Sequence, residues 1–173
     1  MRRMFSVFSV VLTLVFFAPS LQAQVDLKKG DRIVFIGSNT AERFQYFGYW
    51  EALLQSQFKD LNLSVRNQGF NGDEVRFRPR SLDFGTPDDH LNRAKADVIF
   101  AFFGFSESFR GESGLETFTK ELDQFLKHTL AQNYSGKGNA RVVLISPMSF
   151  ETVSYTQIPA HETTEDGGWG GGV

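Results

Sequence analysis

A short run of small polar residues, GSNT at 37–40, follows a hydrophobic segment at 32–36 and precedes a helical pattern. Such a turn places a serine hydroxyl, free backbone N–H groups and a helix N-terminus at one point on the carboxyl edge of a sheet. This combination suits nucleophilic attack by the hydroxyl or the binding of an anion such as phosphate. Open α/β folds place their catalytic and binding groups at the same edge.

Two further loops rich in small residues follow later hydrophobic runs. Residues 67–73 read NQGFNGD, and residues 104–107 read GFSE directly after the apolar run VIFAFF at 98–103. If the strands before these loops are parallel, all three loops lie at one edge of the sheet. Ser38, Gly72 and Ser106 would then face one crevice between the first and third strands.

The elements that must position these loops alternate along the chain. Short β-branched or aromatic runs predict four strands, at 32–36, 63–66, 98–103 and 141–145. Three- and four-residue apolar spacing predicts helices at 41–58 and 115–130. We expect the apolar stripe of the first helix to be core; it comprises Phe44, Phe47, Trp50, Leu54 and Phe58. The alternation predicts a parallel sheet with right-handed βαβ crossovers.

No element is predicted between residues 75 and 90. Arg76, Arg78 and Arg80 alternate there with Val75, Phe77 and Pro79. The three guanidinium groups could converge on one anion. Alternation beside a proline is more typical of a solvated edge or loop, and we expect that arrangement.

The first residues predict a secretory signal peptide at 1–23. A basic start is followed by an apolar run at 5–18, too short to span a bilayer comfortably, and by a cleavage region ending at Ala23. An uncleaved membrane anchor is the alternative. Cleavage predicts an exported protein, periplasmic or extracellular, with no stable membrane insertion.

The amino-acid composition excludes cysteine-based sites and gives no indication of a nucleic-acid partner. The 173 residues include no cysteine, with 18 basic and 20 acidic residues, so disulfides and thiolate metal sites are excluded. Loss of Arg2 and Arg3 with the leader makes the chain more acidic, and bulk charge gives no indication of nucleic-acid binding. We expect one domain at 24–149, incomplete at its C-terminal end, and a disordered glycine-rich tail at 150–173.

Taken together, the three loops resemble the first three conserved blocks of the SGNH, or GDSL-like, hydrolases. The resemblance covers residues 31–147, is most specific in the second block, N-x-G-x-x-G-D, and is nearest to secreted members of planctomycete-type bacteria. It implies a flavodoxin-like, three-layer α/β/α fold in which the last strand and helix are missing here. It also implies an acylhydrolase or carbohydrate esterase acting on a small ester or acylated carbohydrate, with no cofactor and no metal.

The resemblance implies roles for individual residues. With the first turn one residue shorter than in the family, Ser38 is the nucleophile; in the ungapped register Asn39 occupies that position. Gly72 falls on an oxyanion-hole glycine, and Ser106 stands where the family has an oxyanion-hole asparagine. Such a site would hold the oxyanion with the serine's own N–H, the glycine N–H and a side-chain donor.

The base of the family mechanism has no counterpart. The family carries D-x-x-H after its last strand, and this chain ends before any such motif. We interpret His90, His128 and His161 as surface residues and predict hydrolysis barely above background. The alternatives are a non-catalytic module that binds a carbohydrate or acyl ligand, and a flavodoxin-like flavin or phosphate binder.

Overall fold

The computed structural model describes residues 25–148, so the predicted leader and tail lie outside the described residues. At its centre is a four-stranded sheet in the order β2-β1-β3-β4, in which every pair of neighbours is parallel. The strands are β1 (Arg32–Gly37), β2 (Ser64–Asn67), β3 (Val98–Phe102) and β4 (Arg141–Leu144). The predicted parallel sheet, with the first and third strands adjacent, is confirmed.

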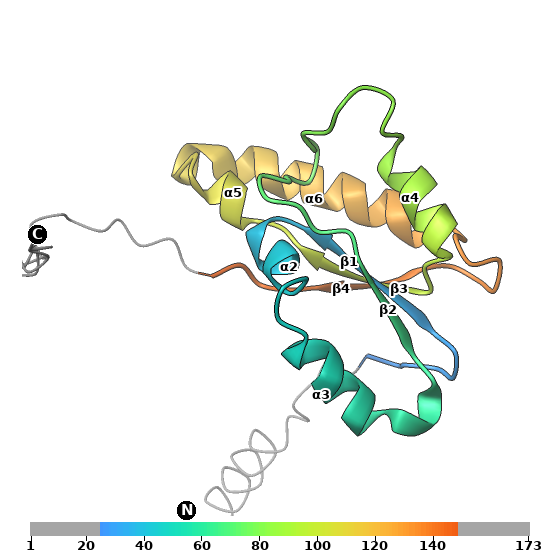
Figure 1. The fold of residues 1–173 in the computed structure, drawn as a ribbon. Coiled ribbons are helices and arrows are strands. Elements are labelled where there is room, and N and C mark those ends of the chain that lie inside the picture. The colour runs from blue at the N-terminus through green and yellow to red at the C-terminus, as the bar shows by residue number, and fades with distance from the viewer. Residues whose placement is uncertain (1–24, 149–173) are drawn as a thin grey trace, which may run out of the picture.

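The two central strands are buried on both faces, as their continuous apolar runs require. Val34 and Ile36 of β1 pack with β3 residues beneath α4 (Pro87–Ala94) and α6 (Leu115–Leu130). Ile33 and Phe35 face the opposite side, where the core includes Leu54 of α3 (Tyr49–Gln57). Figure 1 shows α4 and α6 on one side of the sheet and α3 on the other, which is the expected three-layer α/β/α arrangement.

Four short helices complete the described chain. Two follow the carboxyl ends of central strands: α2 (Asn39–Arg43) comes after β1, and α5 (Phe105–Ser108) comes after β3. The other two are single turns of 3₁₀ helix, η1 (Lys59–Leu61) and η2 (Glu112–Gly114). The helix predicted at 115–130 is confirmed as α6.

The single helix predicted at 41–58 is wrong, because the chain turns between α2 and α3. Phe44 and Trp50 both pack on Phe35, with ring centroids 6.2 and 4.7 Å away. On a continuous helix, residues six apart point in directions about 240° apart, so both rings could not reach one β1 side chain. The predicted core stripe fails at two positions for the same reason: Phe47 is 53% exposed and Phe58 is 38% exposed.

The helix α4 is an element that the sequence prediction missed. Thr86 caps it, accepting the Asp89 N–H, while the Asp89 carboxylate accepts the Thr86 N–H. Pro87 occupies the first turn. The run TPDD therefore carried a capping box and an N-terminal proline, both recognisable signals of a helix start.

Candidate functional site

The structure brings Ser38 and Ser106 into direct contact. Ser38 follows β1 and Ser106 lies in α5 after β3, and their Oγ atoms are 2.8 Å apart. The contact follows from the topology, because Gly37 and Phe102 are register partners at the carboxyl ends of two neighbouring parallel strands. The two serines thus lie where an open α/β sheet concentrates its functional groups.

Both polar groups of Ser38 are already engaged. Its N–H donates to the Phe102 carbonyl at 3.1 Å, and its hydroxyl donates to the Asn39 side-chain oxygen at 2.8 Å. Since a hydroxyl has one proton, the Ser106 hydroxyl is the donor in the contact between the serines. Ser38 is only 2% exposed. An amide oxygen is not a general base, so nothing in this arrangement removes the Ser38 proton.

Asn39 occupies a different position in the same turn. It is the first residue of α2 and is half-buried, whereas Ser38 is the residue before the helix, in extended backbone. The two candidate positions for the nucleophile are thus neighbours in one turn, and Ser38 is the one whose hydroxyl contacts Ser106.

Gly72 lies on the second loop, which is attached to the end of β1. The Phe70 N–H donates to the Gly37 carbonyl at 2.9 Å, and the Asp73 N–H donates to the Phe70 carbonyl at 3.1 Å. Gly72 is exposed, with φ +83°. The loop thus reaches the predicted edge of the sheet, with Gly72 at its surface.

Glu107 holds this loop to the end of β3, a role that the sequence prediction missed. Its two carboxylate oxygens accept the N–H groups of Val75 and Gly104, each at 2.9 Å. The side chain is buried. The signal in the sequence was an acidic residue three positions after a glycine that ends a buried strand, which is the spacing of a capping box.

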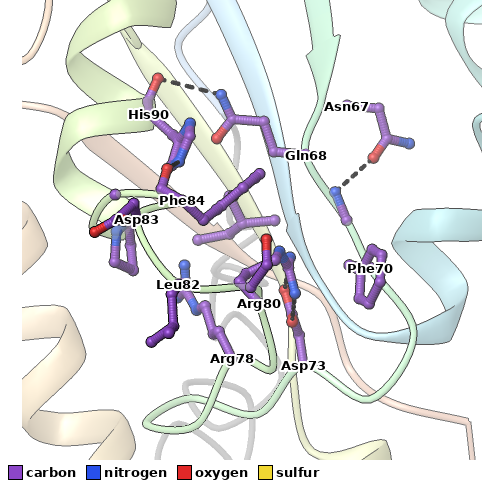
Figure 2. Close-up of a pocket in the computed structure, with 15 residues that line it drawn as sticks. Asn67, Gln68, Phe70, Asp73, Arg78, Arg80, Leu82, Asp83, Phe84 and His90 are labelled. Atoms are coloured by element: carbon purple, nitrogen blue, oxygen red, sulfur yellow. Dashed lines mark hydrogen bonds and ion pairs between the residues drawn. The ribbon is translucent and has the colours of Figure 1, made fainter.

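A cavity of about 610 Å³ opens between the second loop and the segment that leads to α4. Ile36 of β1 lines it, two residues before Ser38, whereas Ser38 and Ser106 themselves do not. Figure 2 shows the side chains around the cavity. Polar and aromatic side chains also line the cavity: Gln68, Phe70, Asp73, Arg78, Arg80, Asp83, Phe84 and His90. The volume falls in the range of small-molecule sites.

The prediction that the arginines of the 75–90 segment are solvated is wrong for Arg80. Its guanidinium binds both carboxylate oxygens of buried Asp73, at 2.6 and 2.9 Å. It also lies over the rings of Phe70 and Phe84, at 4.1 and 5.5 Å from their centroids. Figure 2 shows Arg80 between the two rings. Paired and stacked in this way, Arg80 is a fixed part of the cavity wall.

The prediction also fails for Arg78. The side chain is half-buried over the Phe103 ring, 5.2 Å from its centroid, and burial lowers the pKa of its guanidinium. Its Nε is fully buried and has no hydrogen-bond partner among residues 25–148. Arg76, by contrast, is exposed as predicted.

Two histidines lie within the described residues, and each is engaged away from Ser38. His90 Nε2 lies 2.8 Å from the Phe84 carbonyl, and the ring stacks on Phe84. His128 on α6 pairs with Asp88 at 2.7 Å and is about half exposed. In the part of the chain that is described, Ser38 Oγ has only Asn39 and Ser106 as hydrogen-bond partners. His161 lies outside it.

Residues 25–148 contain no group of three or more histidine, aspartate or glutamate side chains placed to hold a metal ion. No helix among them is both long enough and apolar enough to cross a membrane.

Comparison with solved structures identifies the fold. Two variants of Axe2, an acetyl xylan esterase from Geobacillus stearothermophilus, superpose with TM-scores of 0.52 and 0.50 at 18% identity. The matches cover 71% and 69% of this chain and 62% and 61% of the esterase. BT4096, a gut microbial diltiazem-metabolizing enzyme, matches with a TM-score of 0.50 and 20% identity, over 71% of this chain and 28% of its own.

The likeness shows that the chain shares its parallel α/β fold with these enzymes. The expected α/β fold with a parallel sheet is confirmed. The chain spans about three-fifths of the length of the Axe2 structures that it matches. No family model matches the chain, and no curated protein matches it.

Proposed function

We propose that the chain is an SGNH-like ester-hydrolase domain that binds a small ester or acylated carbohydrate and, as it stands, turns esters over barely above background. The observation that carries the proposal is the contact between Ser38 and Ser106 at the carboxyl ends of adjacent parallel strands. A hydroxyl at this edge supplies the nucleophile of a serine ester hydrolase, though not its base, and Ile36 of the same strand lines a cavity of small-molecule size.

The impairment has two physical reasons. The Ser38 N–H donates a hydrogen bond to the Phe102 carbonyl, so this N–H is not available to a developing oxyanion. The Ser38 proton is donated to an amide oxygen, which cannot act as a base. Loss of one oxyanion donor alone costs on the order of a hundredfold or more in rate. An unassisted serine hydroxyl is in addition a weak nucleophile near neutral pH.

The substrate class and location complete the proposal. The fold is shared with an acetyl xylan esterase, which supports an acylated carbohydrate as the ligand. The leader pattern at 1–23 supports export to the periplasm or the cell exterior, with cleavage after Ala23.

The test is an activated acetyl ester assay on the exported chain, which begins at Gln24. The comparison is with Ser38→Ala and with Ser64→Ala, a control that removes an exposed hydroxyl on β2. We expect all three proteins to hydrolyse the ester barely above background. Circular dichroism of each variant establishes that the fold is retained.

Two results would contradict the proposal that ester hydrolysis is impaired. Robust hydrolysis that Ser38→Ala abolishes and Ser64→Ala preserves would make Ser38 an activated nucleophile. Robust hydrolysis that survives Ser38→Ala would put the nucleophile at another residue.

A non-catalytic binding module is the second candidate. The ungapped register favours it, because Asn39 then occupies the nucleophile position and the fully engaged Ser38 is structural. The two candidates differ in one measurement: a binding module shows ligand binding with no ester turnover at any pH.

A further inference from the structure

The cavity between the second loop and the segment that leads to α4 has features of a site for a hydroxyl-rich ring. Phe70 and Phe84 are each nearly half exposed and contribute apolar ring surface to it. His90 Nε2 donates to the Phe84 carbonyl, so Nδ1 is the ring nitrogen left to contact a ligand. Among residues 25–148 the Gln68 side-chain oxygen accepts no hydrogen bond, while its Nε2 donates to the His90 carbonyl. Acceptors beside an apolar wall suit the hydroxyls and C–H face of a sugar.

Among the residues described, one cation that lines the cavity has no direct ion pair, although Asp73 and Asp88 lie near enough to act on it. Arg80 and Asp73 neutralise each other through two hydrogen bonds. Arg78 forms no ion pair with any residue of the described range, and its buried Nε has no hydrogen-bond partner. Asp83 also lines the cavity, on its exposed rim.

The carboxylates nearest to Arg78 are committed elsewhere. Asp73 is bound by Arg80. Asp88 accepts hydrogen bonds from Tyr134, at 2.6 Å, and pairs with His128 at 2.7 Å. Arg78 is half-buried and makes no hydrogen bond or ion pair with any residue of 25–148, so a carboxylate bound in the cavity would give its guanidinium a charge-assisted partner.

We propose that this cavity binds a saccharide that bears one carboxylate, with the carboxylate on the Arg78 guanidinium. The sugar ring lies against the exposed part of Phe70, and its hydroxyls contact Gln68 and His90. A planar carboxylate matches the fork of a guanidinium. A phosphate dianion fits less well, because Asp73 and Asp83 line the same cavity and only one cation in it is unpaired.

This inference deepens the proposed function, since it adds an acidic group to the saccharide class proposed there. The binding step itself needs no serine chemistry. The two proposals can therefore fail separately: ester turnover without preference for an acidic sugar would contradict only this one, and binding of an acidic sugar without turnover would leave it standing.

The experiment is calorimetric titration of the exported chain with glucuronate, glucuronamide, glucose and glucose 6-phosphate. Glucuronamide keeps the ring and replaces the carboxylate by a neutral group of similar shape. We expect glucuronate to bind at least about tenfold more tightly than glucuronamide or glucose, a difference typical of one charge-assisted contact. This comparison uses the unaltered protein and does not depend on how any variant folds.

A pair of variants then locates the contact. Arg78 also lines a smaller cavity of about 260 Å³ next to α6, and Arg76 lines that smaller cavity only. Arg78→Gln should remove the preference for glucuronate over glucuronamide, and Arg76→Gln, which makes the same change of charge two residues away, should retain it.

Four results would overturn the proposal. They are equal affinity for glucuronate and glucuronamide, no binding of either, tighter binding of glucose 6-phosphate than of glucuronate, and retention of the preference in folded Arg78→Gln, whatever Arg76→Gln does.

Discussion

Glu107 shows how one buried carboxylate can position a functional loop. It is 4% exposed and accepts the N–H groups of Val75 and Gly104, so it joins the loop after β2 to the turn after β3. Both contacts are to backbone donors, which need an acceptor when they are buried. The negative charge is thus held by two oriented peptide dipoles.

Replacing this carboxylate by an amide should destabilise the protein. In Glu107→Gln one carboxylate oxygen becomes an NH₂ group that faces an N–H, so one buried donor loses its acceptor. We expect a loss of about 1–3 kcal/mol in the free energy of unfolding, measured by urea denaturation. Glu116→Gln, on the exposed surface of α6, is the matched control and should be close to neutral. Equal midpoints for the two variants would show that Glu107 does not hold the loop.

At the scale of elements, Gly37 determines how closely β1 and β3 approach at the functional edge. It is the last residue of β1, with φ +121°. A Cβ at this position would lie 2.3 Å from the Phe102 carbonyl oxygen, the atom that also accepts the Ser38 N–H. The position of the Ser38 turn thus depends on the absence of a side chain at residue 37.

Gly37→Ala should therefore be more costly than an ordinary glycine substitution. We expect a loss of about 2–4 kcal/mol in unfolding free energy, because the methyl group pushes the β1 end away from β3. The control is Gly30→Ala, which has φ +75° but open space at its Cβ. It carries the backbone strain alone, about 1–2 kcal/mol. Thermal or urea unfolding measures both variants. Equal losses of unfolding free energy in Gly37→Ala and Gly30→Ala would show that the contact with Phe102 adds nothing to the cost.

At the scale of the whole molecule, Asp97 ties the amino ends of three strands together. Its side chain accepts the Arg32 N–H at 3.0 Å and contacts Lys137 Nζ at 3.3 Å, and its backbone bonds to Arg32 and Arg141. Burial by itself would raise the pKa of Asp97. Hydrogen bonds from Ser135, Arg32 and Lys137 outweigh that effect and hold the pKa below its ordinary value.

This lowered pKa predicts a specific acid sensitivity. A carboxyl whose pKa is lower in the folded state stabilises the protein above its unfolded pKa, near about 4, and loses that contribution as the pH falls through the folded pKa. Asp97→Asn should thus destabilise the protein at pH 6, and its difference from wild type should shrink toward pH 3. Urea denaturation at both pH values measures this. Asp60→Asn, on the exposed η1 turn, should show no such convergence; a constant difference for Asp97→Asn would contradict the assignment.

The sequence determined the strands, the longest helix and the edge of the sheet at which the small-residue loops meet. Continuous apolar runs such as that of β3, and the 3.6-residue period of α6, are local properties that any packing must satisfy. Parallel strands place the residues after them at one edge, which predicted that Ser38 and Ser106 lie at the same edge but not that their hydroxyls touch.

Only the tertiary structure decided what those groups can do. Phe102 takes the Ser38 N–H, and Asp73 takes Arg80 while Arg78 is left without an ion-pair partner among the described residues. The break between α2 and α3 likewise depends on Phe35, which both neighbouring aromatic rings must reach. Each of these contacts depends on a residue from another part of the chain. Whether a polar group has a hydrogen-bond partner therefore depends on both residues of the contact. Sequence periodicity reports burial along one element, whereas hydrogen-bond satisfaction is settled by which elements meet.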